Sequence, residues 1–132
     1  MVVIANDYLI EAWRKRTWSE REATRFVYTI TCTENGKVYV GITREPMERA
    51  RNHRSQLRCG THQNKNLQID YQKYGGDSFV FEIVQKTTSI RAIRDKVEEK
   101  NIRKYKSYDP KYGYNDCPYS KMMREVFSIC NE

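Results

Sequence analysis

The alternation of apolar and polar residues predicts two adjoining strands near residue 30. Strand-forming residues fill Phe26–Thr31, and valine and isoleucine alternate with other side chains over residues 37–42. The connection contains Asn35-Gly36, a strong hairpin signal because both residues tolerate positive φ. We therefore expect an antiparallel hairpin with one buried face and one face free to carry chemistry.

The spacing across this turn places two tyrosines on one face of the hairpin. With a two-residue Asn-Gly loop, Tyr39 pairs with Cys32, which lies an even number of residues from Tyr28. A connection four residues longer sets Tyr39 directly opposite Tyr28. Both registers predict that the two tyrosines project from the same side of the sheet.

Residues 46–59 have the pattern of an amphipathic helix. Pro46 suits its first turn, and Gly60 suits its end. Arg49 and His53 are four residues apart and share a face, which by itself predicts only solvent exposure. The apolar face of this helix consists of Met47, Ala50 and Leu57.

A second helix, a third strand and a long helix follow along the chain. The second helix is predicted over residues 61–76, the strand over 78–85, and the long helix over 87–106 with Ser89 as its cap. The second helix is expected to pack through Leu67, Ile69, Tyr71 and Tyr74. The core stripe of the long helix is predicted to be Ile90, Ile93 and Val97, with Glu98, Ile102 and Tyr105 on a neighbouring face.

This order of elements predicts an α/β (α+β) fold, a small three-stranded antiparallel sheet flanked by helices. The length of 132 residues suits one compact domain. We expect an N-terminal helical extension over residues 1–24, with a helix at 4–16, then a central domain over 25–116. A weak helical pattern marks the tail, 117–132.

The charge of the chain favours a polyanionic partner. The formal net charge is +7 and the pI is about 9.3, which points most simply to nucleic acid. A solvated basic surface is the alternative at this point. The ten tyrosines combine a packing ring with a hydroxyl, which suits wet, charged binding surfaces.

The cysteines and the apolar segments indicate a cytoplasmic location. The four cysteines form no CxxC pair, and their spacing is not that of a disulfide framework, which favours a reducing compartment. Cys59 and His62 have the spacing of half a zinc site without a second half, so we expect unligated side chains. The N-terminus lacks a signal pattern, and no apolar run is long enough to span a membrane, so no membrane partner is expected.

The hairpin resembles the signature of the GIY-YIG nuclease family. Val27-Tyr28, followed by Tyr39-Val40-Gly41, is similar to its two-part motif, with Phe26 in place of the first glycine. In that family an arginine follows the second motif by eight residues, often with a histidine one turn later, and Arg49 and His53 stand at those positions. The resemblance spans about residues 25–116 and implies the fold of the family and a homing-endonuclease-like catalytic domain.

The resemblance implies a catalytic site whose residue types suit phosphodiester hydrolysis. A fixed guanidinium at Arg49 suits the charge that develops on the phosphate. Either Tyr28 or His53 is the general base. A phenol needs a lowered pKa for that role, whereas the imidazole is better matched in pKa but alternatively positions phosphate. Tyr39 is expected to order the water or the phosphate.

Glu98 is the expected metal ligand, holding one Mg²⁺ (or Mn²⁺) ion per site. A carboxylate that binds a hard cation supplies Lewis acidity and stabilises the leaving group. Neighbouring Glu99 is the competitor. Ile102, four residues after Glu98, favours the first register, because the acid of the family precedes an apolar residue by four. Gly41 and Asn115 are expected to support the site structurally.

DNA is the expected partner, and its phosphates are expected to contact the basic side chains around the site, which give affinity without sequence information. The first 25 residues and the tail contain no zinc-ligand pattern, clear helix-turn-helix or long basic helix. We therefore expect weak sequence preference, with any DNA-recognition domain separate or missing. The alternative is a non-catalytic nucleic-acid-binding module with stacking tyrosines, which needs no metal. The expected phosphate contacts are Arg44, Arg51, Arg54, Arg58, Lys100, Arg103 and Lys104.

Overall fold

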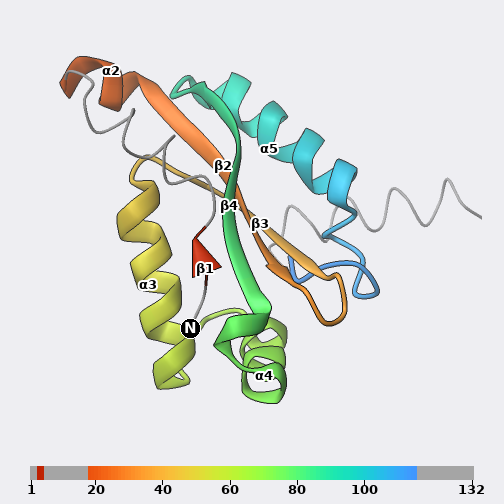
Figure 1. The fold of residues 1–132 in the computed structure, drawn as a ribbon. Coiled ribbons are helices and arrows are strands. Elements are labelled where there is room, and N and C mark those ends of the chain that lie inside the picture. Colours follow the sequence, from red (N-terminus) through yellow and green to blue (C-terminus); the bar gives the residue numbers. More distant parts are fainter. Residues whose placement is uncertain (1–2, 5–17, 116–132) are drawn as a thin grey trace, which may run out of the picture.

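The computed structural model describes residues 3–4 and 18–115, which form a sheet with helices on both faces (Figure 1). The strand order is β1-β4-β2-β3. Strands β3, β2 and β4 are antiparallel, as predicted, and the short β1 pairs in parallel with β4. The elements are β1 (Val3–Ile4), α2 (Trp18–Ala23), β2 (Thr24–Cys32), β3 (Val38–Thr43), α3 (Pro46–Cys59), α4 (Lys65–Tyr74), the 3-10 helix η1 (Gly76–Ser78), β4 (Phe79–Thr88) and α5 (Arg91–Tyr105).

The β2–β3 hairpin has a register between the two that the sequence allowed. Tyr39 lies opposite Ile30, and Tyr28 lies opposite Gly41. The turn is longer than an Asn-Gly loop because the Cys32 amide donates to the Lys37 carbonyl, which leaves residues 33–36 to reverse the chain. Gly36 takes the left-handed conformation there, with φ of 73°. Tyr28 and Tyr39 lie on the same face, as predicted, with ring centroids 6.3 Å apart.

Two apolar clusters hold the helices to the two faces of the sheet. On one face, α3 and α4 cover alternate residues of β2 and β4, with Ala50, Leu57 and Leu67 buried against Phe79 and Phe81. On the other face, α5 packs on Val27, Val38 and Val40. Figure 1 shows α3 and α5 on opposite sides of the strands. The predicted apolar face of α3 is confirmed.

The buried face of α5 differs from the predicted stripe. Ile90 is 59% exposed and Ile93 is 46% exposed, whereas Ile102 is fully buried. Val97 and Tyr105 pack beside Ile102 on the same cluster. The face that carries Glu98 and Ile102 is therefore the one turned toward the sheet. A similar correction applies to α4, where Ile69 is 60% exposed.

Several predicted boundaries shift. β4 continues to Thr88 because it pairs with the whole of β2, so α5 begins at Arg91, and Ile90 takes the cap position instead of Ser89. α4 begins at Lys65 because the Asn64 side chain caps it, accepting from the Leu67 amide. Ile4 is in β1 and not in a helix. Residues 5–16 of the predicted helix, and the predicted tail over 117–132, lie outside the described residues.

None of the helices in the described part of the chain combines the length and the apolar character needed to cross a membrane.

Candidate active site

A cavity of about 420 Å³ lies where β3, α3, the α3–α4 connection, α5 and the segment after α5 meet. Its lining combines one guanidinium, two imidazoles, one phenol and one carboxylate with several amides. No other cationic side chain lines it among the described residues. The lining residues are Tyr39, Arg49, His53, Gln56, His62, Gln63, Asn64, Glu98 and Asn115. The structure therefore brings together Tyr39, Arg49, His53 and Glu98 from separate elements.

Tyr28 lies directly behind this cavity and is 1% exposed. Its ring crosses the backbone of the neighbouring strand at Gly41. A Cβ added at Gly41 would lie 2.3 Å from the Cζ and Oη atoms of Tyr28, which is far inside van der Waals contact. The absence of a side chain at Gly41 thus sets the position of the Tyr28 hydroxyl.

A chain of hydrogen bonds fixes the tautomers of both histidines. The backbone N–H of Asn64 donates to His62 Nδ1 at 3.0 Å, so a neutral His62 carries its proton on Nε2. That proton is donated to His53 Nδ1 at 2.7 Å, which leaves the proton of His53 on Nε2. His53 Nε2 lies 2.7 Å from Tyr28 Oη and therefore donates to it. Neither ring nitrogen of His53 keeps a free lone pair.

Tyr28 Oη accepts a second hydrogen bond, from Arg49 Nε at 3.2 Å. Two donors therefore face the Tyr28 oxygen, an arrangement that favours negative charge there. Burial outweighs this effect and raises the pKa of Tyr28 above its ordinary value, with Tyr39 adding to the rise. Arg49 acts in the other direction, lowering the pKa of Tyr28.

Both imidazoles are held in the neutral form. Burial, followed by the positive charge of Arg49 and the nearby His62, lowers the pKa of His53 from 6.5 to about 3. Burial also lowers the pKa of His62. Their neutrality agrees with the tautomers that the hydrogen bonds require.

Tyr39 is the tyrosine that reaches the cavity. Its ring packs edge-on against His53 and His62, at centroid distances of 5.6 and 6.4 Å. It therefore stands between the buried Tyr28 and the space open to a ligand.

Asn115 braces the free edge of β3. Its side-chain amide forms two hydrogen bonds with the backbone of Val40, both 2.8 Å long. Gly113 lets this segment approach, since a Cβ there would lie 2.1 Å from Ser107 Cα. The loop after α5 is thereby joined to the strand that carries Tyr39.

The structure separates the two candidate acids on α5. Glu98 lines the cavity, whereas Glu99 accepts a hydrogen bond from Arg103 at 2.6 Å on the outer surface. Burial raises the pKa of Glu98, and Asp95 adds to the rise, while Arg94 opposes it. Among the described residues the Glu98 carboxylate has no hydrogen-bond or ion-pair partner within 4 Å.

The ligand groups at this cavity suit one weakly bound divalent cation better than a metal ion enclosed by several protein ligands. No group of three or more His, Cys, Asp or Glu side chains converges within the described ranges. A single carboxylate facing an open cavity suits Mg²⁺, which keeps its waters and takes further oxygens from phosphate. His62 does not suit zinc, because both of its ring nitrogens are hydrogen-bonded. Cys59 is a free, exposed thiol.

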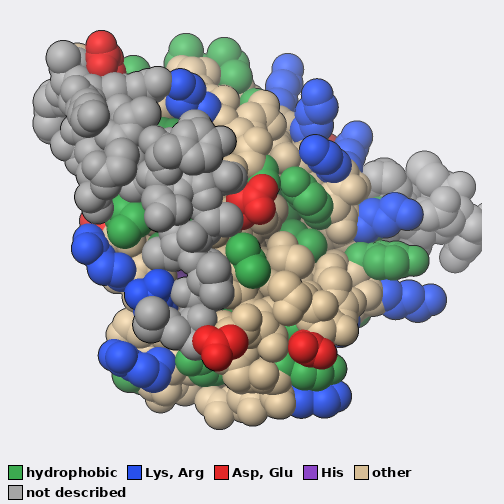
Figure 2. Space-filling view, in the orientation of Figure 1, with side chains coloured by type: hydrophobic (Ala, Val, Ile, Leu, Met, Phe, Trp, Pro, Cys, Tyr) green, Lys and Arg blue, Asp and Glu red, His purple; other side chains and the backbone are tan. Residues whose placement is uncertain are grey.

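Most of the predicted phosphate-binding side chains point away from the cavity. An α-helix turns about 100° per residue, so Arg51, Arg54 and Arg58 lie roughly 140–180° from Arg49 around α3. On α5, Lys100, Arg103 and Lys104 lie about 120–160° from Glu98, and Arg103 is paired with Glu99. Figure 2 shows lysine and arginine side chains on the α3 side and on the α5 side of the molecule. The outward α5 set is Lys100, Arg103 and Lys104.

Sequence reasoning missed His62 and the amides beside it as site residues. His62 lies nine positions after His53, and no helical or strand period relates them. They meet because α3 ends at Gly60 in a left-handed turn, with φ of 77°, which reverses the chain toward the cavity. A glycine helix end followed two residues later by a histidine was the available signal.

The sequence and the fold match those of known nuclease domains. A sequence model of the GIY-YIG catalytic domain matches residues 25–115. The catalytic domain of homing endonuclease I-TevI is 28% identical over 69% of this chain and 96% of that chain, with a TM-score of 0.61. A mutant of the catalytic domain of intron endonuclease I-TevI is 27% identical over 70% and 92% of the two chains, with a TM-score of 0.62. A search of curated proteins found no match.

Proposed function

The chain belongs to the GIY-YIG nuclease family, and on that premise we propose that it is a divalent-metal-dependent endonuclease that hydrolyses phosphodiester bonds of DNA. The observation that carries the proposal is the convergence of Arg49, Tyr39, the His53–Tyr28 pair and Glu98 on one cavity. These groups supply charge stabilisation, water positioning and a cation ligand, the three requirements of the reaction.

Arg49 is assigned to the phosphate. Its Nε donates to Tyr28, which fixes the guanidinium plane, and Tyr39 is a second hydrogen-bond partner of the same guanidinium at the cavity. A planar fork held in this way can donate two parallel hydrogen bonds to phosphate oxygens as negative charge develops on them.

Glu98 is assigned to the cation, with one Mg²⁺ or Mn²⁺ ion per site. When bound there, the ion supplies Lewis acidity and stabilises the leaving oxygen. The raised pKa of the Glu98 carboxyl supports this role, because a cation favours the ionised form that burial and Asp95 disfavour.

The proton of the attacking water is assigned to the tyrosine pair and not to His53. His53 offers no free lone pair, since its Nδ1 accepts from His62 and its Nε2 donates to Tyr28. Burial raises the pKa of Tyr28, so Tyr28 is the protonated member of the pair and hydrogen-bonds to Tyr39. Tyr39 faces the cavity and is assigned, as the phenolate, to take the proton from the attacking water.

A supercoiled plasmid tests this function. The protein is incubated with the plasmid in Mg²⁺, in Mn²⁺ and in EDTA, with Arg49→Ala as the control against a contaminating nuclease. We expect nicking or cleavage in either metal, none in EDTA, and a strong loss in the variant. Binding of the plasmid without cleavage in any metal would favour the non-catalytic nucleic-acid-binding module instead, and cleavage in EDTA would contradict the role of the metal.

A further inference from the structure

A second hollow lies beside the cavity, on the other side of Arg49. It has a volume of about 190 Å³ and lies at the junction of β3 and α3. Arg49 lines both spaces, so a long ligand that extends from the cavity past Arg49 enters this hollow. The lining residues are Thr43, Arg44, Glu45, Glu48, Arg49 and Asn52.

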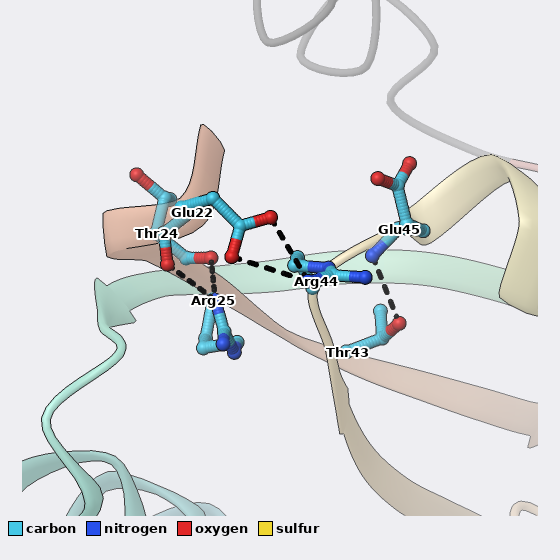
Figure 3. A network of polar contacts seen from close by, with 6 residues as sticks. All are labelled: Glu22, Thr24, Arg25, Thr43, Arg44 and Glu45. Atoms are coloured by element: carbon cyan, nitrogen blue, oxygen red, sulfur yellow. Dashed lines mark hydrogen bonds and ion pairs between the residues drawn. The ribbon is translucent and has the colours of Figure 1, made fainter. Parts of the chain in front are cut away.

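Arg44, at this hollow, is bound to a carboxylate from α2. Its Nη1 lies 2.9 and 3.2 Å from the two carboxylate oxygens of Glu22, as Figure 3 shows. The two side chains are 48% and 36% exposed. An ion pair this exposed contributes little stability and exchanges readily for another anion.

Two further arginines lie close to this pair. Arg25 donates through Nη1 to the backbone carbonyls of Glu22 and Thr24, which holds its guanidinium at the end of α2 (Figure 3). Burial and the positive charges of Arg94 and Arg44 lower the pKa of Arg25, and Glu22 opposes them. Arg94 itself lies on α5, where its Nε is 3.9 Å from a carboxylate oxygen of Asp95.

Arg44 is thus bound to the Glu22 carboxylate and Arg25 to the Glu22 backbone, beside the hollow that Arg49 lines. Like charges gathered in this way repel one another unless an anion lies between them. A nucleic-acid strand presents a negative charge at each nucleotide, about 3.4 Å apart along the helix axis. A strand whose scissile phosphate contacts Arg49 would carry its next phosphates either back into the cavity or on into this hollow.

We propose that Arg44 and Arg25 bind the DNA phosphates that flank the scissile phosphate, and that the Glu22 carboxylate occupies the position of one of these phosphates in the free protein. The inference rests on the proposed function, because it takes Arg49 as the scissile contact. DNA must displace Glu22 from Arg44, so Glu22 lowers the affinity for DNA. The arginines bind the backbone without reading bases.

A double-mutant cycle on DNA affinity tests the inference. The full chain is titrated into a fluorescein-labelled 20-base-pair duplex of mixed sequence in EDTA, where no cleavage occurs, at several salt concentrations. We expect Glu22→Gln to bind about twofold to fivefold more tightly, the range that follows from a weak exposed ion pair. Arg44→Ala should bind more weakly, with a salt slope smaller by about 0.9. In the Arg44→Ala background, Glu22→Gln should have no further effect.

Glu99→Gln is the matched control. Its carboxylate forms an ion pair with Arg103 of similar exposure on the outer face of α5, and the substitution changes the net charge equally. An equal gain from Glu99→Gln would reduce the effect to net charge and overturn the inference. A gain from Glu22→Gln that persists without Arg44, or no duplex binding by the unmodified chain, would also overturn it. Because DNA binding is measured without metal, its result is independent of the cleavage assay. A chain that binds DNA in this way but does not cleave it would contradict only the proposed nuclease function.

Discussion

The position of the Tyr28 hydroxyl is set by three neighbours that are distant in the sequence. Gly41 gives the ring its space, and His53 and Arg49 donate to its oxygen. At the scale of single residues, the site therefore depends on a missing side chain as much as on the polar groups.

A methyl group at Gly41 should displace Tyr28. Gly41→Ala places a Cβ where the ring stands, so we expect a loss of about 1–3 kcal/mol in the free energy of unfolding and a strong loss of cleavage. Urea unfolding measures the first. In a Tyr28→Ser background the same substitution should cost much less, because the clash is gone. Equal costs in both backgrounds would contradict the close approach.

The two neutral histidines should make the fold sensitive to acid. The unfolded chain binds a proton at each histidine near pH 6.5, whereas folded His53 does so only near pH 3. Between these values the unfolded state holds more protons, so their contribution is complete above pH 6.5. For His53 it is lost as the pH falls toward 3, by up to about 1.4 kcal/mol per pH unit, and the lowered pKa of His62 acts in the same direction.

Denaturant unfolding at a series of pH values checks this slope. His53→Gln should flatten it over that pH range, since glutamine has no proton to gain. A slope that is unchanged in His53→Gln would show that other groups are responsible.

At the scale of elements, the strands were easier to predict than the faces of the helices. The same-face placement of Tyr28 and Tyr39 follows from the period of two, and it survives any even shift in register. The length of the turn did not follow, because it depends on Asn35, which donates to Asp70 on α4 and accepts from the Lys37 amide. The contact with Asp70 is tertiary, so it leaves no pattern in the local sequence.

On α5, two apolar faces competed and local spacing could not choose between them. The face with Ile90 and Ile93 lies near the N-terminal end of the helix, where both residues are largely exposed. The face with Ile102 meets the valines of β2 and β3. The relation of His62 to His53 escaped prediction for a similar reason, because a chain reversal after Gly60 creates it.

Alanine substitutions should separate the two faces of α5. Ile102→Ala removes a fully buried side chain and should cost about 2–5 kcal/mol in the free energy of unfolding. Ile93→Ala, the matched control, should change it by no more than about 0.5 kcal/mol. Urea unfolding of both variants measures the difference, and a comparable loss in the two would contradict the orientation of the helix.

At the scale of the whole molecule, the basic side chains do not form one surface around the cavity. Those on the outer sides of α3 and α5 face away from it, while Arg49 and the arginines near Glu22 lie beside it. Contacts from arginine and lysine side chains bind the phosphate backbone of DNA. The amide side chains near the cavity are too few for extended base readout.

Cleavage by this chain should therefore show weak sequence preference. Sites mapped on a long random-sequence duplex should be numerous and share no long consensus. Binding should weaken with salt by a slope of about 0.9 per phosphate contacted. A single sharp consensus of about six base pairs or more would refute this expectation, because base contacts of about 1–3 kcal/mol each would then be needed.

The central claim is that Glu98, held at the cavity, supports phosphodiester hydrolysis by binding a cation. The most direct measurement compares the initial rates of plasmid cleavage in Mg²⁺ for Glu98→Gln and Glu99→Gln, two neighbours of which one lines the cavity and the other pairs with Arg103. We predict a loss of at least about a hundredfold in Glu98→Gln, with folding and DNA binding retained, and a near-normal rate in Glu99→Gln. A near-normal rate in Glu98→Gln, or its loss in Glu99→Gln alone, would contradict the account.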